Sequence, residues 1–262
     1  MFGTYIGDNR MLIKLAYGGY LTISSKDLSI MPTLVTTGIF EVPLTKYFIS
    51  TIKPGFTVVD VGTNVGYFTL LASKLVGTEG RVIGFEANSE LVGTVKDNLA
   101  MNWLTENTTI INKAVYSENK QLEFLNSERF HAYSSIHEKP SDDNLLDTYT
   151  SVVIDAVALD EELKDINSID LLKIDIEGGE YNAFLGMMKL IEQKKIKRIT
   201  FEWNSPMLGE RAQPFLLILS DLLNRLGGRL YFLNSEGNPV PTTLKDISSV
   251  EFYPFALIEF SS

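Results

Sequence analysis

Residues 56–66 combine a short apolar run with a carboxylate, an amide and two glycines. The run Phe56–Val59 is aromatic and β-branched, which is typical of a buried strand, and the next seven residues read D-V-G-T-N-V-G from Asp60 to Gly66. A strand that turns through glycines into a helix brings backbone N–H groups and loop side chains to a small polar ligand. This stretch is therefore the candidate binding site.

The charge in this loop indicates which ligand it binds. A dinucleotide site carries G-x-G-x-x-G directly after the strand, and that pattern is absent here. Asp60 places a carboxylate where a phosphate would be repelled and an amine attracted. S-adenosyl-L-methionine has such an amine and no phosphate, and Glu86, at the end of the next predicted strand, could accept hydrogen bonds from its ribose hydroxyls. The two acids predict a site for this methyl donor.

Alternating strands and helices position these acids. A helix face follows the loop at Phe68, Leu71 and Leu75, and further strands are predicted at residues 81–86, 109–115, 151–157, 169–175 and 198–202. We expect an α/β fold with a doubly wound, mostly parallel Rossmann-like sheet, whose ligands lie beyond the carboxyl ends of the strands. The four acids that end strands should then converge there: Asp60, Glu86, Asp175 and Glu202.

Two regions look like additions to this sheet. Residues 11–17 and 20–23 predict a β-hairpin that turns at Gly18-Gly19, within an N-terminal β-rich appendage of residues 1–35. The binding domain would cover residues 36–262. Residues 116–150 lose the regular alternation, which predicts surface structure or a lid over the site.

Composition excludes several classes of function. A net charge of −10 argues against a nucleic-acid partner, and the absence of cysteine excludes disulfides, thiolate zinc sites and a cysteine nucleophile. We find no secretory signal and no run long enough to span a membrane, so we expect a cytoplasmic location. The acceptor is expected to be a small molecule or a glycan, and a homo-oligomer is left open.

Six segments resemble the FkbM family of S-adenosylmethionine-dependent methyltransferases in order and spacing, over roughly residues 38–204. They are Gly38–Glu41, Asp60–Leu71, Gly80–Asn88, Asn112–Val115, Leu159-Asp160 and Leu172–Glu180. The resemblance implies a class I methyltransferase fold and O-methylation of a hydroxyl on a sugar or natural product. Thr63, Ala87 and Gly179 depart from the usual residues, and Ala87 leaves the shape of the adenine pocket less defined.

Residues from the loop and the neighbouring strands form the expected donor site. The resemblance adds Glu41, which would close over the methionine end of the donor. The full expected set is Glu41, Asp60, Gly62, Thr63, Asn64, Gly66, Tyr67, Phe68, Glu86, Ala87, Asn88, Ala114 and Asp175.

Activation of the acceptor hydroxyl has more than one solution. A general base contributes about 10²–10⁴-fold, and the candidates are His131, Asp175 and Glu202. Alternatively Asp175, Glu202 and Asn204 offer hard oxygen ligands for Mg²⁺, which would lower the pKa of a bound hydroxyl. Glu177 and Glu180 either line the site or stabilise the helix after Gly178. A nicotinamide-dependent oxidoreductase and a non-catalytic binding module of this fold remain the alternatives.

Overall fold

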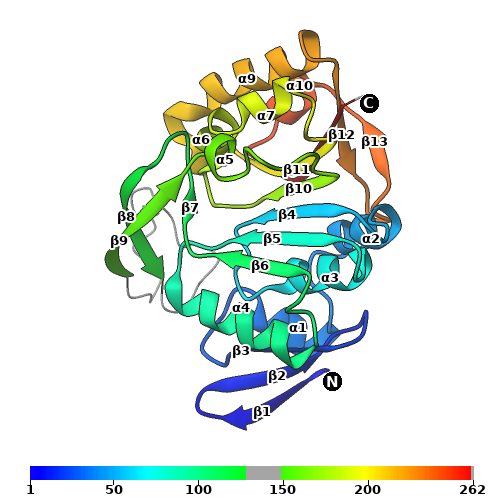
Figure 1. Cartoon of the computed structure of the whole chain (residues 1–262), viewed down its shortest axis with the longest axis vertical. Coiled ribbons are helices and arrows are strands. Elements are labelled where there is room, and N and C mark those ends of the chain that lie inside the picture. Colours follow the sequence, from blue (N-terminus) through cyan, green and yellow to red (C-terminus); the bar gives the residue numbers. More distant parts are fainter. Residues whose placement is uncertain (128–148, 261–262) are drawn as a thin grey trace.

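The computed structural model describes residues 1–127 and 149–260. Its central sheet has eight strands among these residues (Figure 1), in the order β13 (Pro239–Pro241), β12 (Gly228–Leu233), β14 (Phe252–Phe260), β11 (Arg198–Asn204), β10 (Leu171–Ile174), β4 (Thr57–Val61), β5 (Arg81–Phe85) and β6 (Thr108–Ile111). The five strands from β11 to β6 are parallel, whereas β14 runs antiparallel to both of its neighbours and β13 antiparallel to β12. The mostly parallel Rossmann-like sheet is confirmed.

The order of the strands creates a crevice between β4 and β10. The chain moves from β4 outward to β5 and β6, and it later returns to the other side of β4 to form β10 and then β11. The loops that leave β4 and β10 therefore diverge, and a ligand site forms at such a switch point.

Helices cover both faces of the sheet because its buried strands are apolar on both sides. Val58 and Leu171 pack with the helices α2 (Val42–Thr51), α3 (Tyr67–Val76) and α4 (Ser89–Met101). Val59 and Leu172, one residue further along, point the other way and pack with α6 (Glu180–Leu185), α7 (Met188–Glu192) and α9 (Ala212–Asn224). The shorter helices are α5 (Leu159–Glu162), α8 (Ser205–Leu208) and α10 (Leu244–Ser248), with a 3₁₀ turn at Gly209–Arg211.

The N-terminal region forms a separate sheet of three strands, β1 (Gly3–Gly7), β2 (Arg10–Lys14) and β3 (Tyr20–Ser24). The predicted hairpin corresponds to β2 and β3, while β1 was not predicted, since its five residues carry little apolar alternation. Ile13 and Leu21 belong to the same apolar cluster as α4. The expected boundary at residue 36 lies inside α1 (Met31–Thr37), so that division of the chain stays a prediction.

A third sheet corrects two predicted strands. The strand expected at residues 109–115 is interrupted, because the Asn112 side chain turns back to donate hydrogen bonds to the carbonyl oxygens of Glu86 and Ala87 at 2.8 and 3.1 Å. Beyond it β7 (Ala114–Val115) leaves the central sheet and pairs with β9 (Tyr149–Val157), which also pairs with β8 (Lys120–Ser127). The strand expected at residues 151–157 therefore lies outside the central sheet.

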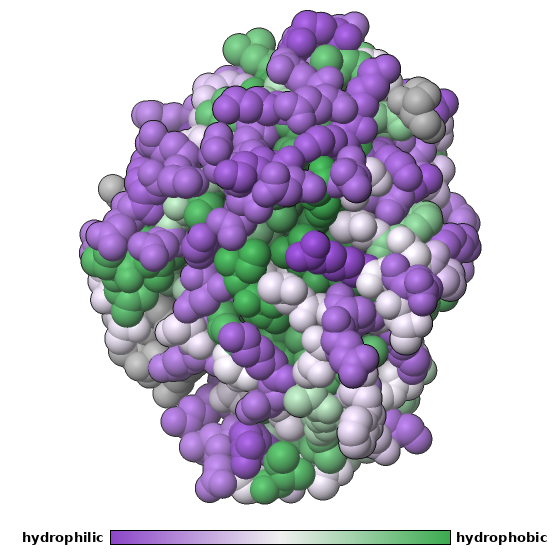
Figure 2. All heavy atoms as spheres, in the orientation of Figure 1, coloured by the Kyte–Doolittle hydropathy of each residue, from purple (hydrophilic) through white to green (hydrophobic). Residues whose placement is uncertain are grey.

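The surface in Figure 2 carries hydrophilic side chains over much of the face shown, with an apolar patch near its middle. Among the described residues, we find no helix with the length and apolar character needed to cross a bilayer. The central part of the predicted lid, residues 128–148, lies outside the described residues.

Candidate functional site

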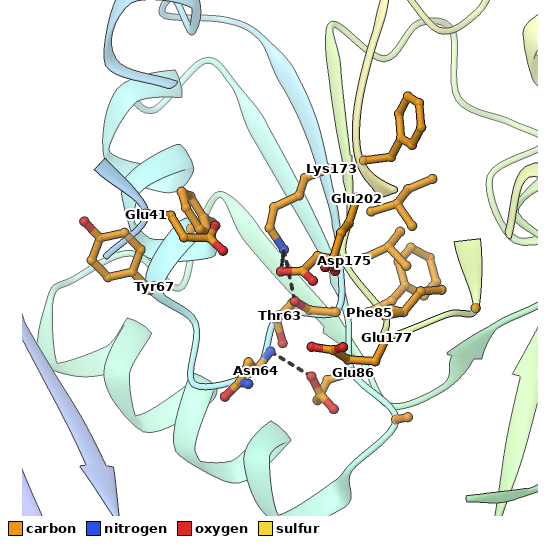
Figure 3. A pocket seen from close by; sticks show the side chains of 18 of the residues that line it. Glu41, Thr63, Asn64, Tyr67, Phe85, Glu86, Lys173, Asp175, Glu177 and Glu202 are labelled. Carbon is orange, nitrogen blue, oxygen red and sulfur yellow. Dashed lines mark hydrogen bonds and ion pairs between the residues drawn. The ribbon is translucent and has the colours of Figure 1, made fainter. Parts of the chain in front are cut away.

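A cavity of about 520 Å³ opens at the crevice between β4 and β10. This volume is within the range of small-molecule sites, on the order of 300–1,000 Å³. The carboxylates that line it come from different elements, and Figure 3 shows several of them converging on one space. Those among the described residues are Glu41, Glu86, Asp175, Glu177 and Glu202.

The glycine loop after β4 packs tightly against the loop after β10. Gly62 has φ of +82°, and a Cβ atom there would lie 2.0 Å from the carbonyl oxygen of Asp175. Only glycine fits this position, for reasons of both backbone conformation and space. The two loops that border the crevice are therefore held in contact at Gly62.

The first three backbone N–H groups of this loop, those of Gly62, Thr63 and Asn64, are already bonded within the protein. Gly62 and Thr63 donate to the carbonyl oxygen of Phe85 at 3.0 and 3.1 Å, and Asn64 donates to Oε2 of Glu86 at 2.8 Å. A pyrophosphate would need such N–H groups unbonded and pointing at it. The loop is therefore unsuited to a dinucleotide, in agreement with the missing glycine pattern.

Glu86 joins the glycine loop to the helix α4. Its Oε1 accepts from the backbone N–H of Asn88 at 2.9 Å, while Oε2 holds Asn64. Burial raises the pKa of Glu86 to about 7, although these two backbone hydrogen bonds oppose the rise. Each carboxylate oxygen can accept a second hydrogen bond, so Glu86 can still receive two hydroxyl groups from the cavity.

Asp60 lies beneath the cavity rather than on its wall. Its carboxylate is 1% exposed, Oδ2 accepts from the Thr69 hydroxyl at 2.6 Å, and Oδ1 is 3.3 Å from Nζ of Lys173. Lys173 is also 3.4 Å from Oδ2 of Asp175 and 3.3 Å from the carbonyl oxygen of Gly62. Asp60 therefore contacts Lys173, which lines the cavity, and does not line the cavity itself. The predicted direct contact between Asp60 and the donor's amine does not fit this arrangement.

Three carboxylates of the cavity wall lie close together near Lys173 (Figure 3). One oxygen each from Asp175, Glu177 and Glu202 lies within 4.8 Å of the others. Burial, reinforced by the charge of Asp175, raises the pKa of Glu202 to about 9 and also raises that of Glu177. Glu177 has a positive φ of 50°, which turns the chain sharply after Ile176. These side chains form an acidic cluster that favours a cation.

One of the three metal ligands expected from the sequence, Asn204, is replaced by Glu177 in the group of acids that the structure brings together. Asn204 caps α8, because its Oδ1 accepts from the backbone N–H of Met207 at 3.3 Å, and its Nδ2 donates to Glu202 at 3.3 Å. The third carboxylate beside Asp175 and Glu202 is Glu177. Bound Mg²⁺ therefore stays a prediction, and its expected ligands would be these three acids.

Glu41 and Tyr67 close the cavity on the side of α2 and α3. Burial and the nearby Asp175 raise the pKa of Glu41 to about 8, with Lys173 acting in the opposite direction. The Tyr67 hydroxyl is 3.1 Å from that of Thr45, which fixes the ring against the cavity. Phe40 and Glu41, which precede α2, are thus part of the cavity wall.

Most of the expected residues do line the cavity, namely Glu41, Gly62, Thr63, Asn64, Tyr67, Phe68, Glu86, Ala87, Ala114, Asp175, Glu202 and Asn204. Three do not. Asp60 lies beneath it, Gly66 begins α3, and the Asn88 side chain caps α4 by accepting from Glu90 at 3.0 Å. Glu180 is fully buried, and its Oε1 accepts a hydrogen bond from the backbone N–H of Ile176 at 3.1 Å. Its position in the first turn of α6 agrees with the alternative that it stabilises the start of this helix. His131 lies outside the described residues.

Sequence reasoning missed part of the wall. Phe252 and Phe255 on β14 line the cavity, as do Leu28 and Ile30 before α1. Neither segment carries a chemical signature, and β14 reaches the site only because it pairs with β11. Thr200 was also missed, and it lines the cavity beside Lys173, with which it pairs in register.

Comparison with known families decides the class of the protein. Residues 60–230 match the family model described as the methyltransferase FkbM domain, which covers more than half of the chain. The chain belongs to the FkbM methyltransferase family. The matched range begins at Asp60 and contains the glycine loop, Glu86, the acidic cluster and β11, so this FkbM domain includes most of the cavity.

Individual relatives are more distant. Protein-L-isoaspartate O-methyltransferase 1 of Arabidopsis thaliana is 48% identical over 48 residues, which are 18% of this chain and 21% of that protein. Solved structures include an O-methyltransferase from Bacillus cereus in complex with S-adenosylhomocysteine (13% identity, TM-score 0.49, 85% of this chain and 82% of that one). An rRNA methylase from Streptococcus thermophilus has 13% identity and a TM-score of 0.45, over 83% of this chain and 94% of that one.

Proposed function

We propose that this FkbM methyltransferase uses S-adenosyl-L-methionine to methylate a hydroxyl group on a sugar, glycan or natural product. The observation that carries the choice of donor is the glycine loop, whose backbone N–H groups are bonded to Phe85 and Glu86 and cannot hold a phosphate. The acidic cavity supports it further, because the donor carries an amine and a sulfonium.

The cavity residues fit the two halves of this donor. Glu86 keeps lone pairs for ribose hydroxyls, and Phe85, Ala87 and Leu91 add apolar surface beside it for the adenine. At the other end, Glu41 would receive the amine, in the role predicted from the sequence for Asp60. When bound, the donor supplies an electrophilic methyl group on a sulfonium.

The protein's own contribution would be to orient the acceptor and to take its proton. Asp175 is the best placed base, because its backbone contacts Gly62 on the donor side while its carboxylate joins the acidic cluster. Lys173 holds that carboxylate in position. Asp175→Asn should lower the turnover rate by about 10²–10⁴-fold. Turnover that stays normal would reject Asp175 and return the role to Glu202 or to His131.

Calorimetric titration tests the donor assignment directly. We expect S-adenosylhomocysteine to release heat on binding and NAD to give none. Heat with NAD alone would establish the oxidoreductase alternative instead. A binding module would bind S-adenosylhomocysteine and transfer no labelled methyl group to any acceptor, so a screen of sugars, lipid-linked glycans and small alcohols separates it from the enzyme.

The acceptor is proposed to be small rather than a nucleic acid. The net charge of −10 and the acidic cavity would repel phosphates. Competition between an rRNA fragment and a sugar acceptor for the enzyme bound to S-adenosylhomocysteine would contradict this. Cytoplasmic location and the oligomeric state stay predictions.

A further inference from the structure

The cavity has more carboxylates than the methyl donor has positive groups to pair with them. Five carboxylates line it among the described residues, against two lysines. Both lysines are already paired, Lys173 with Asp60 and Asp175, and Lys113 with Glu162 at 2.8 Å. The donor has two positive groups and one carboxylate, which leaves it a single net positive charge. A second positive group would therefore find carboxylates in the cavity to which it can donate hydrogen bonds.

Glu177 and Glu202 complete the acidic cluster beside Asp175. Asp175 contacts the donor side through Gly62, while Glu202 lies across the cluster on β11. The oxygens of the three acids lie within 4.8 Å of one another, a spacing that a single cationic nitrogen can bridge. A primary ammonium has three N–H donors, and two of them would find carboxylates in Glu177 and Glu202.

Thr200 is an independent sign that a polar ligand enters this part of the cavity. It lies two residues before Glu202 on β11, and both residues line the cavity. It is 2% exposed and lines the cavity, and its hydroxyl has no hydrogen-bond partner among the described residues. A buried hydroxyl is rarely left unpaired, so a ligand with a polar group would satisfy it.

The walls around the acids favour an organic cation over a bare metal ion. Phe252, Phe255 and Ile176 line the same cavity, and such surfaces pack against the carbon skeleton of a ligand. A hydrated metal ion would make no use of these apolar surfaces, because water completes its coordination.

We propose that Glu177 and Glu202 bind a primary ammonium group of the acceptor, so that the acceptor is an amino alcohol, such as an amino sugar, and a hydroxyl of the same molecule receives the methyl group. This inference rests on the proposed methyltransferase function. It adds the chemical class of the acceptor, which neither the family nor its relatives specify.

The test compares ligands that differ only in the ammonium group. Enzyme saturated with S-adenosylhomocysteine is titrated with glucosamine, N-acetylglucosamine and glucose, and with 2-aminoethanol against ethylene glycol, by calorimetry or ligand-observed NMR. We expect the ammonium member of at least one series to bind about ten- to a hundredfold more tightly than its neutral analogues, as charge-assisted hydrogen bonds would give.

Variants identify the site. Glu177→Gln and Glu202→Gln should each reduce the preference for the ammonium ligand and leave the affinity for S-adenosylhomocysteine within about twofold. The exposed Glu236, which pairs with Lys46 and does not line the cavity, supplies the matched control as Glu236→Gln.

Three outcomes would overturn the proposal: equal binding of ammonium and neutral ligands, no binding of any ammonium ligand, or tight Mg²⁺ binding that needs Glu177 and Glu202 and enhances a neutral diol. Failure of the proposed function looks different, because S-adenosylhomocysteine itself would then not bind. The preliminary titration with S-adenosylhomocysteine therefore separates the two failures.

Discussion

Gly62 is the residue at which backbone conformation and ligand binding depend on each other most directly. A methyl group at this position would meet the carbonyl oxygen of Asp175 and would also be strained by the positive φ. We expect Gly62→Ala to abolish measurable binding of S-adenosylhomocysteine in calorimetry, because the loops after β4 and β10 must separate to accommodate it.

Gly55 offers a control for backbone strain alone. It has φ of +85°, and a Cβ atom there would meet nothing within 4 Å. Gly55→Ala should cost about 1–2 kcal/mol in the free energy of unfolding and leave the donor's affinity unchanged. If both variants bound the donor like the unmodified protein, the loop contact at Gly62 would have no role in the site.

The pKa of Glu86 makes stability depend on pH. In the folded protein it is about 7, against an ordinary 4.5, so the folded state keeps a proton that the unfolded state has lost. This contribution to stability is fully present below pH 4.5 and is lost as pH rises to about 7. We expect the urea midpoint of the ligand-free protein to fall between about pH 5 and about pH 7, and to fall less in Glu86→Gln. An equal fall in both proteins would remove Glu86 as its source.

At the scale of elements, three neighbouring strands place polar side chains in one row. Asp60 on β4 pairs in register with Lys173 on β10, and Lys173 pairs with Thr200 on β11. Lys173→Met would leave Asp60 charged, buried and without its counter-ion. We expect it to lower the free energy of unfolding by about 3–5 kcal/mol in urea titration.

A double variant separates the ion pair from packing. Asp60→Asn combined with Lys173→Met should be more stable than the sum of the single changes predicts, by about 0.5–3 kcal/mol. Lys46→Met, at the exposed ion pair with Glu236, provides the surface comparison and should cost less than about 1 kcal/mol. Strict additivity of the two central changes would mean that Asp60 and Lys173 do not stabilise each other.

The sequence is informative about elements whose periodicity is strong. Residues 56–76 alternate apolar residues and glycines clearly enough to predict β4, the loop and α3, and residues 169–175 predict β10. Pairing is harder to predict, because it depends on which strands meet. From the sequence, Asp60 was predicted to bind the ligand at a strand end. In the structure it is buried and pairs in register with Lys173. β9 was predicted as a strand and assigned to the wrong sheet.

At the scale of the whole molecule, one buried amide connects the N-terminal sheet to the site. Asn98 on α4 accepts from the backbone N–H of Thr22 at 2.7 Å and donates to its carbonyl oxygen at 3.0 Å, and it also donates to Val65 in the glycine loop at 3.0 Å. We expect Asn98→Ala to lower the free energy of unfolding by at least about 1–3 kcal/mol, since buried polar groups lose their partners.

The same change should weaken donor binding, because Val65 belongs to the loop. The exposed Asn224, whose side chain donates a hydrogen bond to Ser220 at 3.0 Å, serves as the control, and Asn224→Ala should stay within about 0.5 kcal/mol of the unmodified protein. Calorimetry with S-adenosylhomocysteine and urea unfolding measure both effects. A destabilised Asn98→Ala protein with unchanged affinity would show that the N-terminal sheet supports the fold without influencing the site.

The cavity wall joins segments from far apart in the chain, Leu28–Ile30 before α1 and Phe252–Phe255 on β14. During synthesis, a ribosome-bound chain that has emerged as far as β12 already contains the glycine loop, Glu86 and the acidic cluster, yet it lacks this last part of the wall. Contacts of such long separation form late in folding. Methyl-donor binding is therefore expected to be acquired near the end of folding, after β14 has paired with β11, and retention of the donor would report that step.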